Sequence, residues 1–180
     1  MKISAILSLS LSALVLAACS AVPTTAPSTP AKTAPAAAQT PTTTPTVITS
    51  NDVDTVMNAF IVRMVDGQEV LEPVTTDTVI KSGDLIEYQT LLTNNGKDRV
   101  RNMLVALSLP KGASFNGHVS PSLGTQASVS DGRFVFMPLR TTVNGVVQNV
   151  PFSQYQALRW NIEDLGIGAT AVVKYRATIN

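Results

Sequence analysis

The stretch that decides the fold lies near the end of the chain and reads Thr170-Ala-Val-Val-Lys-Tyr-Arg-Ala-Thr-Ile179. The apolar positions on one side are Ala171, Val173, Tyr175, Ala177 and Ile179, and the polar positions on the other are Lys174, Arg176 and Thr178. A period of two is typical of a strand with one packed face and one wet face. The pattern predicts an antiparallel strand at 170–179.

A second apolar face comes from the segment that begins at Val100. There Met103, Val105, Leu107 and Leu109 alternate with polar residues such as Asn102 and Ser108. Two strands that are apolar on one side each can bury those sides against one another. We therefore expect at least two sheets that share a core.

Turn signals separate the other β-rich segments at short intervals. They are Asp66-Gly67, Ser82-Gly83, Asn95-Gly96, Lys111-Gly112, Asn116-Gly117, Asp131-Gly132 and Asn144-Gly145. The strands we expect lie at 56–65, 68–74, 85–94, 100–109, 126–129, 133–139, 140–143 with 146–149, 157–162 and 170–179. No long segment has a helical period, so the sequence predicts an all-β sandwich or barrel.

The beginning of the chain has the pattern of an export signal. Lys2 precedes an apolar stretch that ends in Leu16-Ala-Ala-Cys19, as in a secretory signal peptide, and this ending resembles the lipobox of bacterial lipoproteins. The resemblance implies a signal peptide at 1–18 and a lipid on Cys19. The alternatives are cleavage without lipidation and an uncleaved membrane helix, although the stretch is shorter than the ~20 residues that spanning requires.

The segment after Cys19 predicts a tether. From Ser20 to Ser50 all but five residues are Pro, Thr, Ala or Ser, and such a composition cannot bury enough apolar surface to offset the entropy of ordering. We expect a disordered linker at 19–50, with a stretched length on the order of 100 Å, which is either plain or O-glycosylated. The domain is expected at 51–180.

Composition restricts the class of partner. The mature part carries equal numbers of basic and acidic side chains, and the arginines are dispersed among acidic neighbours, so we expect no nucleic-acid partner. The only cysteine is Cys19, so a lipidated chain has no disulfide. The expected membrane contact is the lipid on Cys19. Since Ser20 is not the aspartate that favours inner-membrane retention, the outer membrane or the cell surface is favoured.

A family resemblance is carried by Gly83-Asp-Leu-Ile-Glu-Tyr88 and Leu91-Leu-Thr-Asn-Asn-Gly96. The order of these motifs, together with Leu109-Pro110, Trp160 and the final alternating strand, resembles the DUF11 family of bacterial surface-repeat domains. The resemblance implies an immunoglobulin-like antiparallel β-sandwich at a bacterial surface. The segment between Pro110 and Trp160 is longer than is usual in that family.

Catalytic and metal sites have little support in the sequence. The sole histidine, His118, is expected in a Gly- and Ser-rich loop near Ser120, without the further groups that a nucleophilic site needs. One histidine cannot complete a zinc site. Asn51-Asp-Val-Asp54 places oxygen side chains at alternate positions, either as the start of a strand or as part of a calcium loop. We predict no enzyme, no cofactor and no metal.

The extra segment at 138–151 is predicted to form a hairpin with a type I′ Asn-Gly turn. One interpretation gives it an exposed edge for a partner's strand, with candidate binding residues Val143, Val146, Val147, Phe152 and Tyr155. The other, which the sequence favours, places the hairpin within the sandwich's own sheets, because proteins normally cover apolar edges. Trp160 and Tyr88 are expected in the core.

The sequence thus predicts a lipid-anchored envelope protein whose sandwich is a non-catalytic structural or protein-interaction module. The partner is another envelope protein or a cell-wall polymer. The alternative is a cell-surface adhesive or carbohydrate-binding module, for which exposed aromatic residues such as Tyr155 over a polar groove are expected.

Overall fold

The computed structural model describes residues 46–48, 50–130 and 132–180. The predicted signal peptide, Cys19 and most of the predicted linker lie outside the described residues. The described elements are the strands β1 (Thr46–Ile48), β2 (Val53–Val65), β3 (Gln68–Pro73), β4 (Leu85–Asn94), β5 (Val100–Ser108), β6 (Ala113–Ser120), β7 (Gln126–Ser128), β8 (Val135–Phe136), β9 (Arg140–Val143), β10 (Val146–Asn149), β11 (Ala157–Leu165) and β12 (Thr170–Ile179), and the 3₁₀ turn η1 (Phe152–Gln154). None of these residues belongs to a helix long and apolar enough to cross a bilayer.

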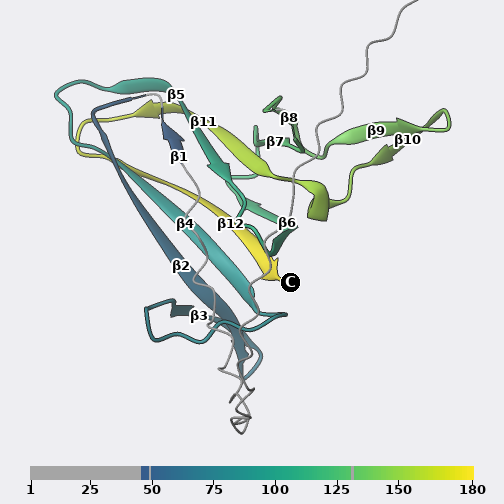
Figure 1. Ribbon diagram of the computed structural model, residues 1–180. Helices are drawn as coiled ribbons and strands as arrows, with labels where there is room; N and C mark the ends of the chain where they lie inside the picture. Colours follow the sequence, from purple (N-terminus) through teal and green to yellow (C-terminus); the bar gives the residue numbers. More distant parts are fainter. Residues whose placement is uncertain (1–45, 49, 131) are drawn as a thin grey trace, which may run out of the picture. The chain divides into compact units, whose positions relative to one another are not determined.

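Two antiparallel five-stranded sheets form the body of the fold (Figure 1). Sheet I has the strand order β3-β2-β4-β12-β6, and sheet II has the order β1-β5-β11-β7-β8. The alternating stretch at 170–179 is β12, which lies between β4 and β6. Its apolar side contributes Val173, Tyr175 and Ala177 to the buried core, as the period of two predicts.

The core lies between the sheets and combines residues from both. From β4, the inward positions include Ile86, Tyr88 and Leu92, and from β5 they are Met103, Val105 and Leu107. Trp160 of β11 is also buried, as expected. The packed layers and antiparallel pairing confirm the all-β, immunoglobulin-like sandwich.

The outer face of sheet I carries a network of ion pairs. Arg176 on β12 donates from Nε to Glu87 on β4 at 2.7 Å, and its two terminal nitrogens donate to Glu69 on β3 at 3.0 and 2.9 Å. Lys174 Nζ lies 3.8 Å from the Glu87 carboxylate. Glu87 is only 2% exposed, so this network satisfies a buried charge.

Sheet II includes a strand that the sequence places in the linker. β1 pairs with β5, with Thr46 opposite Leu107 and Ile48 opposite Val105. β1 has only three residues, which are too few to show an alternating pattern in the sequence. The paired structure therefore begins before residue 51, where the sequence predicts the start of the domain.

A second difference concerns the segment around His118. The Asn116-Gly117 dipeptide predicts a turn, but it lies inside β6, where the register against β12 shifts between Tyr175 and Ala177. Gly117 adopts a φ of 93°, and the His118 N–H donates to Asn116 Oδ1 at 3.0 Å. The dipeptide forms a bulge within a strand, and the expectation that His118 lies in a loop is wrong.

Candidate functional site

The first candidate site is the predicted hairpin, formed by β9 and β10. Among the described residues these strands pair with each other and with neither sheet. Asn144 and Gly145 both have positive φ, at 51° and 79°, as a type I′ turn requires. The favoured interpretation, in which the hairpin belongs to the sandwich's own sheets, is therefore wrong. Figure 1 shows β9 and β10 extending away from the sheets.

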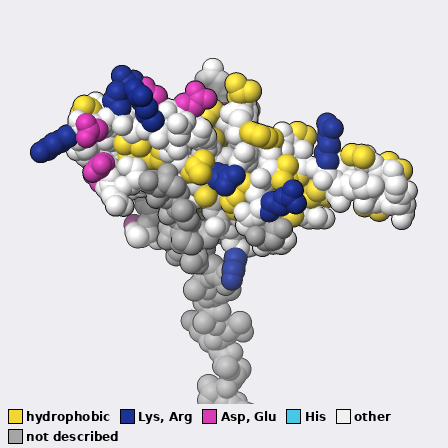
Figure 2. Space-filling view, turned by 90° about the horizontal axis from the view of Figure 1, so that it is seen from above, with side chains coloured by type: hydrophobic (Ala, Val, Ile, Leu, Met, Phe, Trp, Pro, Cys, Tyr) yellow, Lys and Arg dark blue, Asp and Glu magenta, His cyan; other side chains and the backbone are white. Residues whose placement is uncertain are grey.

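The hairpin presents apolar side chains on both of its faces. Every residue of β9 and β10 is exposed. Val143 and Val146 are opposite one another and share a face, whereas Val147, opposite Thr142, lies on the other face. Figure 2 shows hydrophobic side chains along the arm at its right. The three predicted binding residues that lie in the hairpin strands are thus accessible.

The other two predicted residues support the base of the hairpin. Tyr155 is buried, and its hydroxyl accepts a hydrogen bond of 2.8 Å from the Leu139 N–H. Phe152 is partly exposed and packs edge-on against Phe115 and Tyr155, with ring centroids 5.5 and 5.4 Å apart. The expectation that Tyr155 is an exposed aromatic residue is therefore not met, because its ring fills the space beneath the hairpin.

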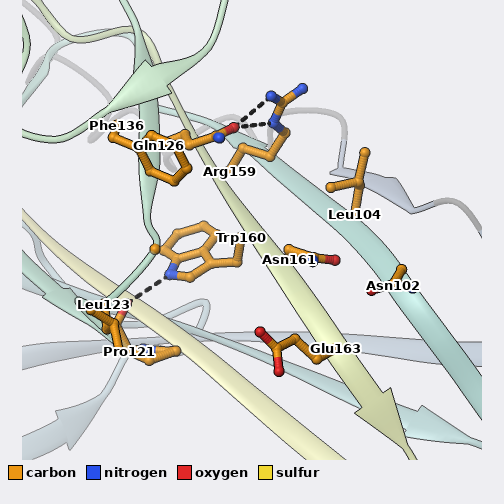
Figure 3. Close-up of a pocket in the computed structure, with 11 residues that line it drawn as sticks. Asn102, Leu104, Pro121, Leu123, Gln126, Phe136, Arg159, Trp160, Asn161 and Glu163 are labelled. Atoms are coloured by element: carbon orange, nitrogen blue, oxygen red, sulfur yellow. Dashed lines mark hydrogen bonds between the residues drawn. The ribbon is translucent and has the colours of Figure 1, made fainter.

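The second candidate site is a groove of about 690 Å³ at the outer side of sheet II (Figure 3). We call it the sheet II groove, and it is lined by Asn102 and Leu104 of β5, Pro121, Leu123 and Gly124 of the β6–β7 loop, Gln126 of β7, Phe136 of β8, and Arg159, Trp160, Asn161 and Glu163 of β11. It arises because β7 pairs only with the first residues of β11, from Ala157 to Arg159. Beyond Arg159 the loop takes the place of a neighbouring strand.

Arg159 lies at one end of the groove, where its side chain is fixed by several contacts. Its Nε and one terminal nitrogen donate to Gln126 Oε1 at 2.9 and 2.5 Å, and its guanidinium carbon lies 4.4 Å from the ring centroid of Phe134. Gln126 is the cross-strand neighbour of both Arg159 and Phe136. These contacts fix the guanidinium orientation and place Phe136 at the same end of the groove (Figure 3).

The loop at the side of the groove is fixed by Trp160. The indole Nε1 donates to the Pro121 carbonyl oxygen at 3.1 Å. Figure 3 shows the indole between the Arg159 end of the groove and Glu163. Leu123, on the same loop, is 94% exposed. The loop is thus attached to the core, while its tip offers an apolar side chain to solvent.

The remaining polar groups of the groove lie at exposed positions. Asn161 and Glu163 occupy alternate, exposed positions of β11, and Asn102 is exposed on the neighbouring β5. Within the part of the chain that the structure describes, none of these three side chains makes a hydrogen bond or an ion pair. Asn102 has a left-handed φ of 52°, which departs from regular strand geometry.

The candidate calcium residues have other roles in the structure. Asp54 accepts a hydrogen bond of 2.5 Å from the Asn95 side chain, and the backbone oxygen of Asp52 accepts one from the Asn95 N–H. Among residues 46–48, 50–130 and 132–180, no group of three or more His, Cys, Asp and Glu side chains is placed so that it could hold a metal ion. Asn51–Asp54 thus connects the beginning of β2 to the turn after β4.

Sequence reasoning found the hairpin but missed the groove. The alternation of Arg159, Asn161 and Glu163 was a usable signal, because it predicts three polar side chains on one face of a strand. The partners from β5, β8 and the β6–β7 loop depend on the tertiary fold. Comparisons with known proteins found no matching family model, no matching curated protein and no matching solved structure.

Proposed function

We propose that this protein is a lipid-anchored component of a bacterial cell envelope whose sandwich is a non-catalytic protein-interaction module. The proposed binding element is the β9–β10 hairpin. The observation that carries the proposal is that this hairpin pairs with neither sheet while every residue of its strands is exposed. An unpaired strand edge is a template for another strand.

The hairpin register identifies the backbone groups that a partner would meet. The Val150 N–H donates to the Leu139 oxygen at 2.9 Å, which makes this opposed pair a hydrogen-bonded one. Because bonded and non-bonded pairs alternate in an antiparallel ladder, the Thr142–Val147 pair directs its backbone groups outward. Thr142 therefore offers an N–H and a C=O on the β9 edge, and Val147 does so on the β10 edge.

The support beneath the hairpin favours a binding element that is formed before the partner arrives. The Tyr155 hydroxyl holds the Leu139 N–H, and Phe152 packs against Phe115 and Tyr155. An element that is already ordered loses less conformational entropy on binding.

The side chains of the hairpin indicate the kind of partner. Arg140 is its only charged residue, and Val143, Val146 and Val147 surround the turn. Such a surface suits an extended segment of another envelope protein that pairs through its backbone and packs apolar side chains on the valines. It does not suit a partner recognised mainly by charge.

The proposed anchor rests on the sequence before residue 20. The Leu-Ala-Ala-Cys19 motif supports export and lipidation, and the resemblance to surface-repeat domains supports an exposed location. Two or more acyl chains hold a protein on a bilayer stably. Cys19→Ala is expected to move the protein from the membrane fraction to the soluble fraction or to block its maturation, as checked by cell fractionation.

The binding element is tested in intact cells by placing a photocrosslinking amino acid at Val146, with Ile167, an exposed residue of the β11–β12 turn, as the matched position. We expect one specific envelope protein to be captured from position 146 and not from position 167. Thr142→Pro and Val147→Pro each remove one outward N–H without touching a bond within the hairpin. At least one should abolish capture, whereas Thr142→Ala, which keeps the N–H, should retain it.

Two results would contradict the interaction site. One is equal capture from both positions, and the other is full capture by both proline variants. Circular dichroism of each variant shows whether the sandwich is intact.

A further inference from the structure

We propose that the sheet II groove is a binding site for an uncharged oligosaccharide. This goes beyond the protein interaction assigned to the hairpin, because the two surfaces share no residue. Four features of the groove support this ligand. Its outward polar side chains are unpaired among the described residues, its rim is apolar and exposed, it has one cation and one anion, and the β6–β7 loop covers the edge of β11 beside it.

The polar set matches the chemistry of sugar hydroxyl groups. Asn102 and Asn161 each carry an amide with donors and an acceptor, and Glu163 carries an acceptor pair. A hydroxyl group donates and accepts at once, so neighbouring hydroxyls on a sugar ring can bind planar amide and carboxylate groups in pairs. All three side chains are available, since none makes a hydrogen bond within the described residues.

The apolar rim matches the other half of a sugar's surface. Phe136 is 63% exposed at the Arg159 end, and Leu123 projects from the loop at the side. A pyranose ring has C–H faces that pack on aromatic and aliphatic side chains, while its equatorial hydroxyls point toward polar groups. The Phe136 ring can therefore contact the C–H face of a sugar while the free amides contact its hydroxyl groups.

The charge of the groove favours a neutral ligand. Its lining has one cation, Arg159, and one anion, Glu163. Arg159 is already bound to Gln126 and stacked on Phe134, so much of its hydrogen-bonding capacity is used. A polyanion would need further cations, and none lines the groove.

A peptide strand fits the groove less well, because the β6–β7 loop already covers the edge of β11 beyond Arg159. The Trp160 indole holds the Pro121 carbonyl beside that edge at 3.1 Å. A strand that paired with β11 beyond Arg159 would have to displace this loop. A saccharide can bind the outward side chains without doing so. The volume of about 690 Å³ lies in the range of small-ligand sites, which is roughly 300–1,000 Å³.

The chain carries its own reporter for the test. Trp160 is the only tryptophan and lines the groove. We expect cellohexaose, maltohexaose or chitohexaose, titrated into the full-length protein, to shift the tryptophan emission saturably. Phe136→Ala and Asn161→Ala should each weaken binding by about tenfold or more, whereas Ile167→Ala, which alters an exposed residue outside the groove, should leave the affinity unchanged.

The opposite outcomes are distinct. The proposal is overturned if none of the three oligosaccharides shifts the emission saturably, or if both groove variants bind as tightly as the unmodified protein. It is also overturned if only a peptide of alternating valine and threonine binds the groove. Thr142→Pro should leave saccharide binding intact, so failure of this inference and failure of the hairpin proposal are separable.

Discussion

Tyr88 and Tyr175 stack on one another across neighbouring strands of sheet I, with ring centroids 4.9 Å apart and an angle of 18° between the ring planes. They are direct cross-strand neighbours of β4 and β12, and both are buried. The Tyr88 hydroxyl is buried and has no hydrogen-bond partner among the described residues. The stack thus combines favourable ring packing with the cost of one unsatisfied polar group.

Tyr88→Phe is expected to raise the free energy of unfolding by about 1 kcal/mol, because it removes the unsatisfied hydroxyl and keeps the ring. Urea-induced unfolding of the full-length protein measures the change. Tyr88→Ala is the control for the ring itself and should lower stability by about 3–5 kcal/mol. A clear loss of stability in the Phe variant would show that the hydroxyl has a partner.

Alkaline pH is expected to destabilise the protein through the same pair. Burial raises the pKa of Tyr88 to about 12, and burial together with the neighbouring Tyr88 raises the pKa of Tyr175. An unfolded phenol ionises near pH 10, so the stabilising contribution is complete below that pH and is lost as pH rises toward 12. Urea midpoints measured between pH 9 and 12 should fall, and fall less in Tyr88→Phe. An equal slope in both proteins would contradict the assignment.

Arg176→Ala is expected to lower the free energy of unfolding by about 3 kcal/mol, because it leaves the buried Glu87 carboxylate with the neutral Gln89 amide and the more distant Lys174. Arg99→Ala is the matched control. It breaks an exposed pair with Asp164, which solvent screens, and should lower the free energy of unfolding much less than Arg176→Ala does. Chemical denaturation of the two variants gives the comparison, and equal losses would argue against a special role for burial.

The same network sets the expected response to acid. Burial alone raises the pKa of Glu87, but hydrogen bonds from Arg176 and Gln89 and the charges of Arg176 and Lys174 outweigh it, so the pKa is lowered overall. Arg176 also lowers the pKa of Glu69 by hydrogen bonding. The contribution to stability is therefore present above the ordinary carboxyl pKa, about 4.5, and is lost as pH falls below it. Arg176→Ala should reduce this acid dependence.

Asn94→Asp is expected to destabilise the protein by about 3 kcal/mol. The Asn94 amide nitrogen donates to the Asp98 and Leu165 oxygens at 2.8 and 3.1 Å, and its Oδ1 accepts from the Gly96 N–H. A carboxylate would face the two carbonyl oxygens without protons to donate. Thermal unfolding monitored by circular dichroism checks this result, with Asn161→Asp, at an exposed position whose side chain makes no hydrogen bond among the described residues, as the control.

Gly117→Ala is expected to cost about 1–3 kcal/mol, since φ at Gly117 is 93° and an added methyl group would collide with the Phe152 ring. Phe152→Ala removes the obstacle but not the backbone strain. The loss caused by Gly117→Ala should therefore be smaller in the Phe152→Ala background, as measured by a double-mutant cycle of unfolding free energies. Strict additivity would indicate that the two residues do not meet.

The parts of the fold that the sequence predicted well are those with strong local patterns. The strands at 85–94 and 170–179 have the predicted bounds because alternate positions along each face the core, and Asn144-Gly145 defines the hairpin turn. The turn predicted at Asn116-Gly117 is wrong because this dipeptide suits both a turn and a bulge. Pairing with β12 decides between the two. Local sequence does not contain that pairing.

The candidate sites were predictable to a lesser degree. The valines of the hairpin are exposed as one interpretation required, but whether the hairpin joins a sheet depends on the neighbours of β9 and β10. The burial of Tyr155 and Phe136 also depends on tertiary contacts. Tyr155 is buried at the base of the hairpin, whereas Phe136 is exposed on a two-residue strand. Aromatic identity alone does not distinguish these environments.

The pairing of β1 with β5 has a mechanical consequence. The chain enters the described fold at an edge strand of three residues, whereas it leaves from β12, which has neighbours on both sides. A pulling force applied through residues before Thr46 therefore acts first on the short ladder between β1 and β5. We expect β1 to detach from β5 before the two sheets separate. The detached strand would then add to the length of chain before the sandwich, while the sandwich stays folded.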